Sequence, residues 1–430
     1  MKMALGPCHA SAFSWHVLLP RTAARFSSHV SRRARIDGPL RTMSSSRASC
    51  ETPNELRISR VPLVERSGKH ISTTTEVLMW RQWARAHAAL KKLDESGLDD
   101  LPSLTSLHTE IDWIVGDAIA ATRPRVQGQR QSVWAKRVLI QVHEIPPEHD
   151  ILLRESLSQL RFSWLKRLRE RVPLQYITST CFWRDLTLVV SPAVLIPRPE
   201  TELMVEHVKS ALTTCPVLCR GPWVDLGTGS GALAISVAAE ILKTRTLNAL
   251  EIGCSESEPL VHAVDISSSS VQIARCNISR YDKFAEGGKL GVQVHQGSWF
   301  EPLKLHDIVH DHAGTLAGII SNPPYISSNE MRVLQPEVRY HEPWLALESG
   351  KSGVEALEVL CKGASRYLLP GGFLLLETGG GDQITHIVQL LHSFKKGNWR
   401  ENGGAVQIFE NIQIHADHRG FRRFISAWKC

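Results

Sequence analysis

The chain has 430 residues, and its 43% apolar content is enough for a packed core and excludes a wholly disordered protein. The formal net charge is +7. Residues 1–50 contain eight Lys or Arg and one Asp, which equals the whole excess, so acids and bases balance over the rest. The body lacks the global positive charge of a protein that tracks a phosphate backbone, so we expect no stable nucleic-acid partner. No run approaches the roughly 18 uninterrupted apolar residues of a membrane helix, so we expect no membrane partner.

The first fifty residues are rich in Arg and Ser, almost free of acids, and able to form a short amphipathic helix. This composition is typical of a mitochondrial transit peptide, and the alternative is an ordinary disordered terminus. We predict that residues 1–50 are a transit peptide that directs the protein to the mitochondrial matrix. Translation from a second start at Met43 would yield a cytosolic form. Residues 51–75 are polar without a clear period, and we interpret them as a linker.

Residues 76–170 show a helical pattern. Apolar residues recur at three- and four-residue spacing in three stretches, from Val77 to Ala88, from His108 to Thr122 and from Ile151 to Leu168. Pro146-Pro147 stands just before the third stretch, where proline is tolerated. The pattern predicts a small all-helical domain ahead of the catalytic one.

The period changes after this domain. Leu186, Leu188 and Val190 alternate with other residues, so residues 171–200 are expected to contain a strand pair that connects the domains. From residue 201 to 430, helices and strands alternate, which predicts a mostly parallel sheet covered on both faces. Residues 244–259 form a polar insertion. The strand-like runs are Trp223–Leu226, Leu260–Val264, Val292–His295, Ala317–Ser321 and Phe373–Glu377.

Metal chemistry finds no support in the sequence. The nine Cys include no C-x-x-C pair, so neither a zinc ribbon nor a redox motif is indicated. The run from His306 to His312 lacks the His-Glu-x-x-His order of a zincin. We interpret it as a solvated loop and expect no metal site.

A glycine-rich loop follows the first strand of the sheet and opens a helix. It reads Val-Asp-Leu-Gly-Thr-Gly-Ser-Gly-Ala over residues 224–232, and its glycines let the backbone approach a ligand closely. Asp265 ends the next strand, where a carboxylate can accept hydrogen bonds from ribose hydroxyls. Gly227, Gly229 and Ala232 also satisfy the dinucleotide pattern, so an NAD enzyme remains an alternative here.

The most informative loop follows the fourth strand. Two prolines in Asn322-Pro323-Pro324-Tyr325 fix the backbone and hold the loop stiff at the carboxyl edge of the sheet. Asn322 offers an acceptor oxygen and Tyr325 an aromatic face. Acceptors aimed at two amide hydrogens would orient a planar, poorly nucleophilic nitrogen toward an electrophilic methyl group. The loop therefore favours methylation of a planar nitrogen over hydride transfer.

In these stretches the chain resembles the HemK/PrmC-type release-factor glutamine methyltransferases. The similarity runs from about residue 76 to the C-terminus and is dense from Arg171. Its most discriminating part is Leu195–Glu202, which reads Leu-Ile-Pro-Arg-Pro-Glu-Thr-Glu, whereas the Asn-Pro-Pro-Tyr loop is shared with adenine N6 methyltransferases. The other matching stretches are Arg171–Ile177, the glycine loop, Ala263–Ser267, Asn322–Ile326, Glu337–Arg339 with Glu342-Pro343, and Gly372–Glu377.

The resemblance implies an α/β fold, with a Rossmann-like seven-stranded class I methyltransferase domain behind the helical one. It implies S-adenosylmethionine as cofactor and, as substrate, the glutamine of a Gly-Gly-Gln loop in a class I peptide-chain release factor. If residues 1–50 are a transit peptide, the substrate is the mitochondrial release factor. The resemblance implies that the helical domain helps to bind this factor. We expect the protein to be a monomer. The residues implied for the cofactor are Asp225, Gly227, Thr228, Gly229, Gly231, Asp265, Ser298, Trp299 and Asn322, and those implied for the substrate and catalysis are Asn322, Pro323, Pro324 and Tyr325.

Two positions depart from the family pattern. The family usually has an acid where Ser298 stands, before the aromatic residue after the third strand, and the acid meets the adenine amino group. A hydroxyl is a weaker acceptor, so Trp299 either compensates by stacking or is part of the core. Ser179 replaces a common glycine. Arg198 is expected to pair with a carboxylate, which belongs either to the cofactor or to the protein itself.

Other functions compete with this interpretation. A ribosomal-protein glutamine is a rival substrate, because related enzymes share the loop. Adenine N6 methylation of nucleic acid predicts a basic body, against the balanced charge. A non-catalytic cofactor-binding scaffold is favoured by Ser298 and disfavoured by the intact Asn-Pro-Pro-Tyr loop.

Overall fold

The structure is a computed structural model. The residues it describes are 61–94, 101–125, 134–136, 142–247, 260–283, 285, 289–309, 314–396 and 406–430. The chain divides into Met1–Ile58 and Ser59–Cys430, and all described residues belong to the second unit. The predicted transit peptide, Met43 and residues 248–259 of the predicted insertion therefore lie outside the described residues.

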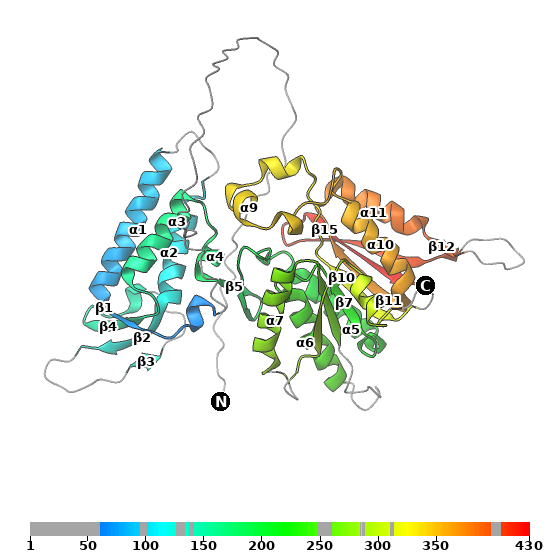
Figure 1. Ribbon diagram of the computed structural model, residues 1–430, viewed down its shortest axis with the longest axis horizontal. Coiled ribbons are helices and arrows are strands. Elements are labelled where there is room, and N and C mark those ends of the chain that lie inside the picture. Colours follow the sequence, from blue (N-terminus) through cyan, green and yellow to red (C-terminus); the bar gives the residue numbers. More distant parts are fainter. Residues whose placement is uncertain are drawn as a thin grey trace, which may run out of the picture. The chain divides into compact units, whose positions relative to one another are not determined.

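The N-terminal region combines three helices with a small antiparallel sheet (Figure 1). The sheet has the strand order β1-β4-β2-β3, which the helical periodicity did not predict. Part of the predicted linker thus forms β1, which pairs with β4. The helices are α1 (Thr74–Asp94), α2 (Leu104–Ala118) and α3 (Leu157–Arg169), and the strands are β1 (His70–Thr73), β2 (Ile119–Pro124), β3 (Ala135–Lys136) and β4 (His149–Leu153), with 3-10 turns at Leu63–Glu65 and Val142–Glu144.

The third predicted helix begins later than its periodicity indicated. Ile151 and Leu152 lie in β4, because β4 pairs with β1 on one side and β2 on the other. Helix α3 starts after Ser156, whose hydroxyl accepts a hydrogen bond from the backbone of Gln159 while the Gln159 side chain accepts one from the backbone of Ser156. This reciprocal capping box satisfies two backbone donors at the helix start. The indole nitrogen of buried Trp164 then donates to Ala84 of α1 at 3.0 Å.

A short helix and a hairpin connect this region to the main sheet. Helix α4 (Leu174–Thr178) is followed by the antiparallel pair β5 (Thr180–Trp183) and β6 (Leu186–Val189). Ser179, between helix and hairpin, has a left-handed backbone with φ of 53°. Glycine adopts this conformation without steric cost, so the glycine that the resemblance led us to expect at this position would suit the backbone better than Ser179 does.

The main sheet has seven strands in the order β14-β15-β11-β10-β7-β8-β9. Neighbouring strands from β11 to β9 pair in parallel, whereas β15 pairs antiparallel with both β11 and β14, so β15 alone runs against the other six strands. The strands are β7 (Trp223–Leu226), β8 (Val261–Asp265), β9 (Val292–Gln296), β10 (Leu316–Ser321), β11 (Leu368–Glu377), β14 (Phe409–Ala416) and β15 (Arg422–Lys429), and a separate pair is formed by β12 (Lys395–Lys396) and β13 (Val406–Gln407). The order identifies an α/β class I methyltransferase fold.

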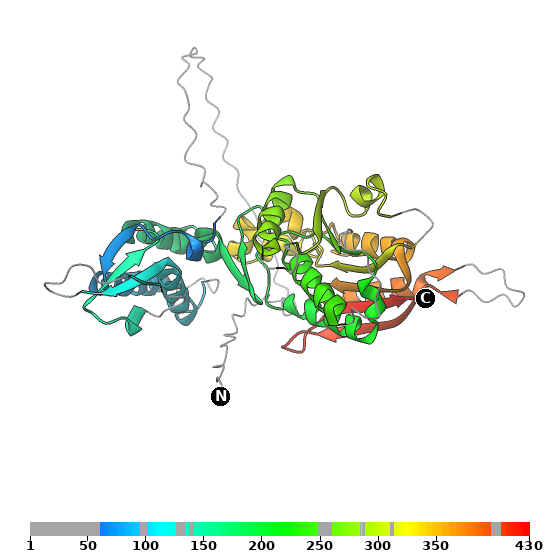
Figure 2. The same cartoon turned by 90° about the horizontal axis from the view of Figure 1, so that it is seen from below.

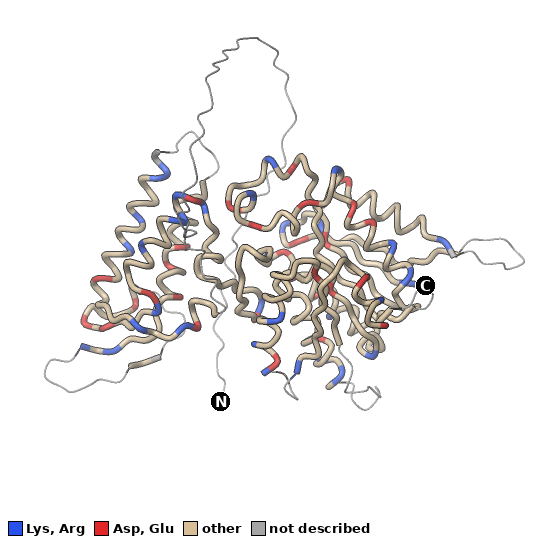
Figure 3. Tube along the Cα trace, in the orientation of Figure 1, with Lys and Arg blue, Asp and Glu red and all other residues tan. Residues whose placement is uncertain are grey.

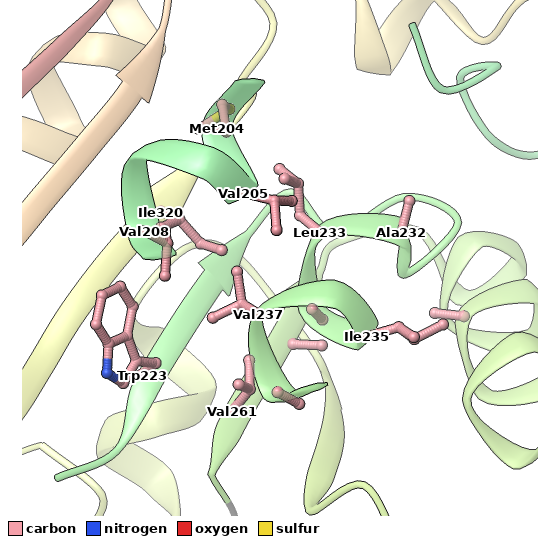
Figure 4. Close-up of a cluster of buried hydrophobic side chains, with 14 of the residues drawn as sticks. Met204, Val205, Val208, Trp223, Ala232, Leu233, Ile235, Val237, Val261 and Ile320 are labelled. Atoms are coloured by element: carbon pink, nitrogen blue, oxygen red, sulfur yellow. The ribbon is translucent and has the colours of Figure 1, made fainter. Parts of the chain in front are cut away.

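Helices cover both faces of the sheet (Figures 1 and 2). Along each strand, alternate residues enter different cores: Trp223 packs on the side of α5 and α6, whereas Val224 packs on the side of α10 and α11. Figure 4 shows the first core, where Val205 and Val237 meet Ile320 of the sheet. The helices are α5 (Glu202–Thr214), α6 (Ala232–Leu247), α7 (Ser268–Asp282), α8 (Glu301–Leu305), α9 (Pro336–His341), α10 (Glu355–Tyr367) and α11 (Gly381–Ser393), with 3-10 turns at Pro216–Cys219, Glu330–Val333 and Trp344–Ala346.

The strand order sets the position of a ligand site. The chain runs outward through β7, β8 and β9 and then returns to β10 on the other side of β7. Ligands of open parallel sheets bind outside the carboxyl ends of the strands at such a reversal. The glycine loop follows β7 and the Asn-Pro-Pro-Tyr loop follows β10, so both lie at this point. None of the helices described here is both long and apolar enough to cross a membrane.

Candidate active site

The glycine loop turns from β7 into α6 with positive φ angles. They are 78° at Gly227, 54° at Gly229 and 83° at Gly231. A Cβ at Gly231 would lie 3.5 Å from Ala274 of α7, so this glycine permits close helix packing. A Cβ at Gly229 would meet nothing within 4 Å, so this part of the loop borders open space. These conformations explain why glycine is needed at the three positions.

Asp225 is a fully buried acid at the base of the loop. Its Oδ2 atom accepts hydrogen bonds from the Thr228 hydroxyl at 2.7 Å and from the Ala234 backbone at 3.2 Å. Its Oδ1 atom is buried without a partner among the described residues. Burial raises the pKa of Asp225 to about 7. An unpartnered buried acceptor is an exception among buried polar groups, and the cofactor role of Asp225 remains a prediction.

Asp265 lies at the end of β8, as the sequence indicated. Its two oxygens accept backbone hydrogen bonds from Gly229 and Ser267, each at 2.9 Å. Asp265 therefore ties the glycine loop to the next strand, and each oxygen keeps lone pairs for a ribose hydroxyl. Burial raises the pKa of Asp265 above its ordinary range. The ribose role remains a prediction, and the carboxylate fits it.

The Asn-Pro-Pro-Tyr loop is held from several sides. The hydroxyl of Ser321, the last residue of β10, donates to the Leu226 carbonyl at 2.5 Å. The side-chain nitrogen of Gln383 in α11 donates to the Tyr325 carbonyl at 2.7 Å. The Tyr325 hydroxyl donates to Glu377 at 3.3 Å. Pro323 is buried and Pro324 is half-buried. These contacts add to the stiffness that the two prolines supply.

The glycine loop, the loop after β9 and the loop after β10 come together. A Cβ at Gly227 would lie 3.9 Å from the Trp299 ring and 4.0 Å from the Asn322 carbonyl oxygen. Trp299 has a left-handed backbone with φ of 46°, an uncommon conformation for a bulky residue. Ser298 precedes it and is half-buried, and its carbonyl accepts a hydrogen bond from Glu301 at 2.9 Å. Adenine contact by Ser298 and Trp299 remains a prediction.

The remaining matching motifs have partners within the protein. Arg198 donates to Glu342 at 2.6 Å, so its carboxylate partner belongs to the fold. Glu337 in α9 is buried, and it accepts hydrogen bonds from Arg167 at 2.9 Å and from Arg171 at 2.7 Å. These pairs connect the segment after the Asn-Pro-Pro-Tyr loop with α3 and with the connecting hairpin region.

No group of three His, Cys, Asp or Glu side chains able to hold a metal ion occurs among the residues with a described placement. Part of the predicted solvated loop, residues 310–312, lies outside them. His262 and His295, on neighbouring strands, are 3.0 Å apart through their ring nitrogens. Burial lowers the pKa of both to about 4, so the pair is neutral at physiological pH.

Three residues at the site were missed by the sequence analysis. Thr201 accepts a hydrogen bond from the Asn322 side chain at 3.2 Å and donates one to Glu377 at 2.7 Å. Gln383 holds the Tyr325 carbonyl. One signal pointed to Glu377, because it ends an apolar strand as Asp265 does. Thr201 lies in the Leu195–Glu202 stretch, which drew attention to its neighbourhood but not to its role. Gln383 gave no signal, since its contact depends on the placement of α11.

Comparisons with known proteins bear on the family of the chain. No protein-family model matches the chain. It is similar to the release factor glutamine methyltransferase of Synechocystis, with 40% identity over 282 residues, 65% of this chain and 80% of the relative. It is similar to that of Gloeobacter violaceus, with 36% identity over 315 residues, 73% of this chain and 87% of the relative.

A solved release-factor-specific protein-(glutamine-N5) methyltransferase of Alicyclobacillus acidocaldarius is matched by 56% of this chain and 98% of that one. The identity is 22% and the TM-score 0.28. The identity and coverage of the sequence relatives, rather than this structural likeness, establish the family. The chain belongs to the release factor glutamine methyltransferase family, whose members are S-adenosylmethionine-dependent protein-glutamine methyltransferases.

Proposed function

We propose that this protein transfers a methyl group from S-adenosylmethionine to the side-chain amide nitrogen of the Gly-Gly-Gln glutamine of a mitochondrial class I release factor. The observation that carries the proposal is Asn322, on a stiff loop that lies beside the glycine loop at the reversal of the sheet. The names of the sequence relatives support the release factor as the substrate class.

The main task of the protein in this reaction is to place the substrate amide against the methyl group of the cofactor. When bound, the cofactor supplies an electrophilic methyl group on a sulfonium. Asn322 and the Pro323 carbonyl accept the two hydrogens of the substrate amide, which fixes the plane of a nitrogen whose lone pair is delocalised. Tyr325 packs on the substrate chain. Orientation and acceptors for the developing positive charge supply the rate enhancement, and water can take the proton that the methylated nitrogen releases.

The cellular compartment rests on residues 1–50. Their Arg- and Ser-rich, acid-poor composition supports import into the mitochondrial matrix, and a start at Met43 would produce a cytosolic form. Synechocystis and Gloeobacter are cyanobacteria, the lineage from which plastids descend, so a plastid release factor is the rival substrate that the comparisons favour. Fusing residues 1–60 to a fluorescent protein distinguishes the two: plastid import would overturn the mitochondrial assignment.

Nucleic-acid methylation fits the charge distribution less well. Figure 3 shows Lys and Arg interspersed with Asp and Glu over the described elements. A phosphate backbone favours a coherent basic surface, whereas a protein substrate does not require one.

The test is mass spectrometry after incubation with isotope-labelled cofactor. The full chain is mixed separately with the mitochondrial release factor, with its Gly-Gly-Gln variant carrying Asn in place of Gln, and with ribosomal proteins. We expect one labelled methyl group on the loop glutamine and none on the variant. Label on a ribosomal-protein glutamine, with the release factor unlabelled, would refute the substrate assignment.

A further inference from the structure

Two of the family-like sequence stretches meet at Asn322. Strands β10 and β11 are parallel neighbours with Ser321 opposite Leu376, so Asn322 and Glu377 come next at the same edge of the sheet. Thr201 comes from the Leu195–Glu202 stretch and directly precedes α5. Three elements thus bring an amide, a carboxylate and a hydroxyl together.

These three side chains form a continuous hydrogen-bonded chain. The Asn322 nitrogen Nδ2 lies 3.2 Å from the Thr201 oxygen Oγ1. That oxygen lies 2.7 Å from Oε2 of Glu377. Thr201 is 5% exposed and Glu377 is 1% exposed, so water does not compete for these bonds. Thr201 therefore depends on Asn322 and Glu377 for its partners, while Glu377 has a second donor in the Tyr325 hydroxyl.

The number of hydrogens decides the direction of the chain. An ionised carboxylate only accepts, and a threonine hydroxyl has one hydrogen to give. The hydroxyl of Thr201 gives its hydrogen to Glu377, so its oxygen can only accept from Asn322. Asn322 must then present its NH2 group to Thr201. If the amide were reversed, two acceptor oxygens would face each other with no hydrogen between them.

We propose that Glu377 and Thr201 are positioning residues that hold the Asn322 amide with its nitrogen inward and its oxygen toward the substrate. The inference rests on the proposed reaction, because an acceptor is required only where the substrate presents amide hydrogens. In the reversed orientation, NH2 would face NH2 and the substrate nitrogen would lose its acceptor. Thr201 contacts Asn322 directly and Glu377 reaches it through the Thr201 hydroxyl, so both act through Asn322.

The ionisation of Glu377 supplies a pH test. Burial raises its pKa from the ordinary value of 4.5 to about 7, although hydrogen bonds from Thr201 and Tyr325 and the charge of Arg423 on β15 oppose the rise. Glu200, before α5, adds to it. Below about pH 7 the protonated carboxyl can donate to Thr201, whose own hydrogen is then free to point at Asn322. The reversed amide becomes possible, so kcat should fall as the pH decreases through 7.

The experiment measures kcat of the full-length protein from pH 6 to 8.5, at saturating cofactor and release factor. In the wild type we expect a low-pH limb near 7. T201V removes the hydroxyl at nearly constant volume, and E377Q removes the titrating proton. Both should lower kcat at pH 8 by about 10- to 100-fold and abolish that limb. T201S keeps the hydroxyl and should restore both kcat and the limb.

Structural effects are controlled separately. T122V, at a buried threonine in β2, makes the same substitution outside the site and should leave kcat and its pH profile unchanged. Cofactor affinity, measured by calorimetry, should be the same in T201V, E377Q and the wild type. The inference is overturned if T201V and E377Q keep the wild-type kcat and pH limb, or if T201S is as impaired as T201V.

A measurement without substrate separates this inference from the proposed reaction. Neutron diffraction of the cofactor complex at pD 8 locates deuterium on the side chains. We expect deuterium between Thr201 and Glu377, and the Asn322 ND2 group facing Thr201. The opposite amide orientation would reject the positioning role even if the release factor is methylated. A wild-type protein that leaves the release factor unmethylated would instead reject the proposed substrate.

Discussion

Two regions of the molecule bury acids in different ways. Where the N-terminal helices contact α9, Arg167 lies beside the buried Glu110 and Glu337. At the edge of the main sheet, hydroxyl and amide groups lie beside the buried Asp225 and Glu377. Arg167 donates to Glu110 at 2.6 Å and to Glu337 at 2.9 Å. Burial alone would raise the pKa of Glu337, but Arg171 and Arg167 lower it below its ordinary range.

At the sheet edge, burial outweighs the groups that lower the pKa of the acids. Burial raises the pKa of Asp225 and of Glu377 to about 7 in each case. An acid compensated by a guanidinium contributes to structure, and its removal leaves an uncompensated charge. An acid that is held only by hydroxyl and amide donors can still accept further hydrogen bonds, but its burial lowers the stability of the fold. The second arrangement is typical of functional sites.

The largest effect should come from breaking the compensated cluster. R167M leaves Glu110 and Glu337 buried without this guanidinium, and we expect a loss of about 3–5 kcal/mol in the free energy of unfolding. Urea denaturation measures it. R169M changes an exposed arginine of the same helix and is the matched control. Equal losses in both variants would show that the cluster does not stabilise the fold.

The reverse pattern is expected at Asn322. N322A removes the amide that orients the substrate, and kcat should fall by about 100- to 1,000-fold, comparable to the loss of an oxyanion-hole donor. Thermal stability should stay at the wild-type value, and the loss in kcat should exceed any loss of cofactor affinity, which Asn322 is also implied to support. N329A, at an exposed asparagine after the same loop, is the control and should remain active. Full activity of N322A would refute its role.

Asp225 tests whether the free acceptor serves the cofactor. D225N keeps an oxygen for Thr228 but removes the charge, and we expect the Kd for S-adenosylmethionine to rise by about 10-fold, the loss of a charged hydrogen bond. The wild type loses stability as the pH rises from 3.8 to about 7, because the unfolded chain releases this proton first. In the absence of cofactor, the stability of D225N relative to the wild type should therefore increase from pH 5 to pH 8.

The smallest functional effect is expected from Asp117 in α2. It is buried, and desolvation raises its pKa from 3.8 to about 7 despite the charge of Arg154. D117N should therefore gain stability relative to the wild type as the pH rises from 5 to 8, as D225N does. Its cofactor affinity should not change. Melting temperatures at both pH values and calorimetry check this, and a weaker cofactor affinity would contradict it.

Much of the candidate site follows from local sequence. The glycine loop, Asp265 and the Asn-Pro-Pro-Tyr loop each lie directly after an apolar run, and such runs became strands close to the predicted bounds. Parallel strands place their carboxyl ends at one edge, so the convergence of these loops could be predicted. The N-terminal sheet could not. Ile151 and Leu152 fit a helical period locally, and their pairing with β1 and β2 depends on strands at distant positions.

By itself, the sequence determined the class of fold, the ligand edge of the sheet and the stiff loop that carries Asn322, because strand periodicity, glycine and proline act within a few residues. Only the tertiary structure decided which way the Asn322 amide is turned and which acids are compensated. Thr201 and Glu377 are 176 residues apart, and Arg167 and Glu337 are 170 apart. Such hydrogen bonds exist only after packing has brought distant segments together and excluded water from them.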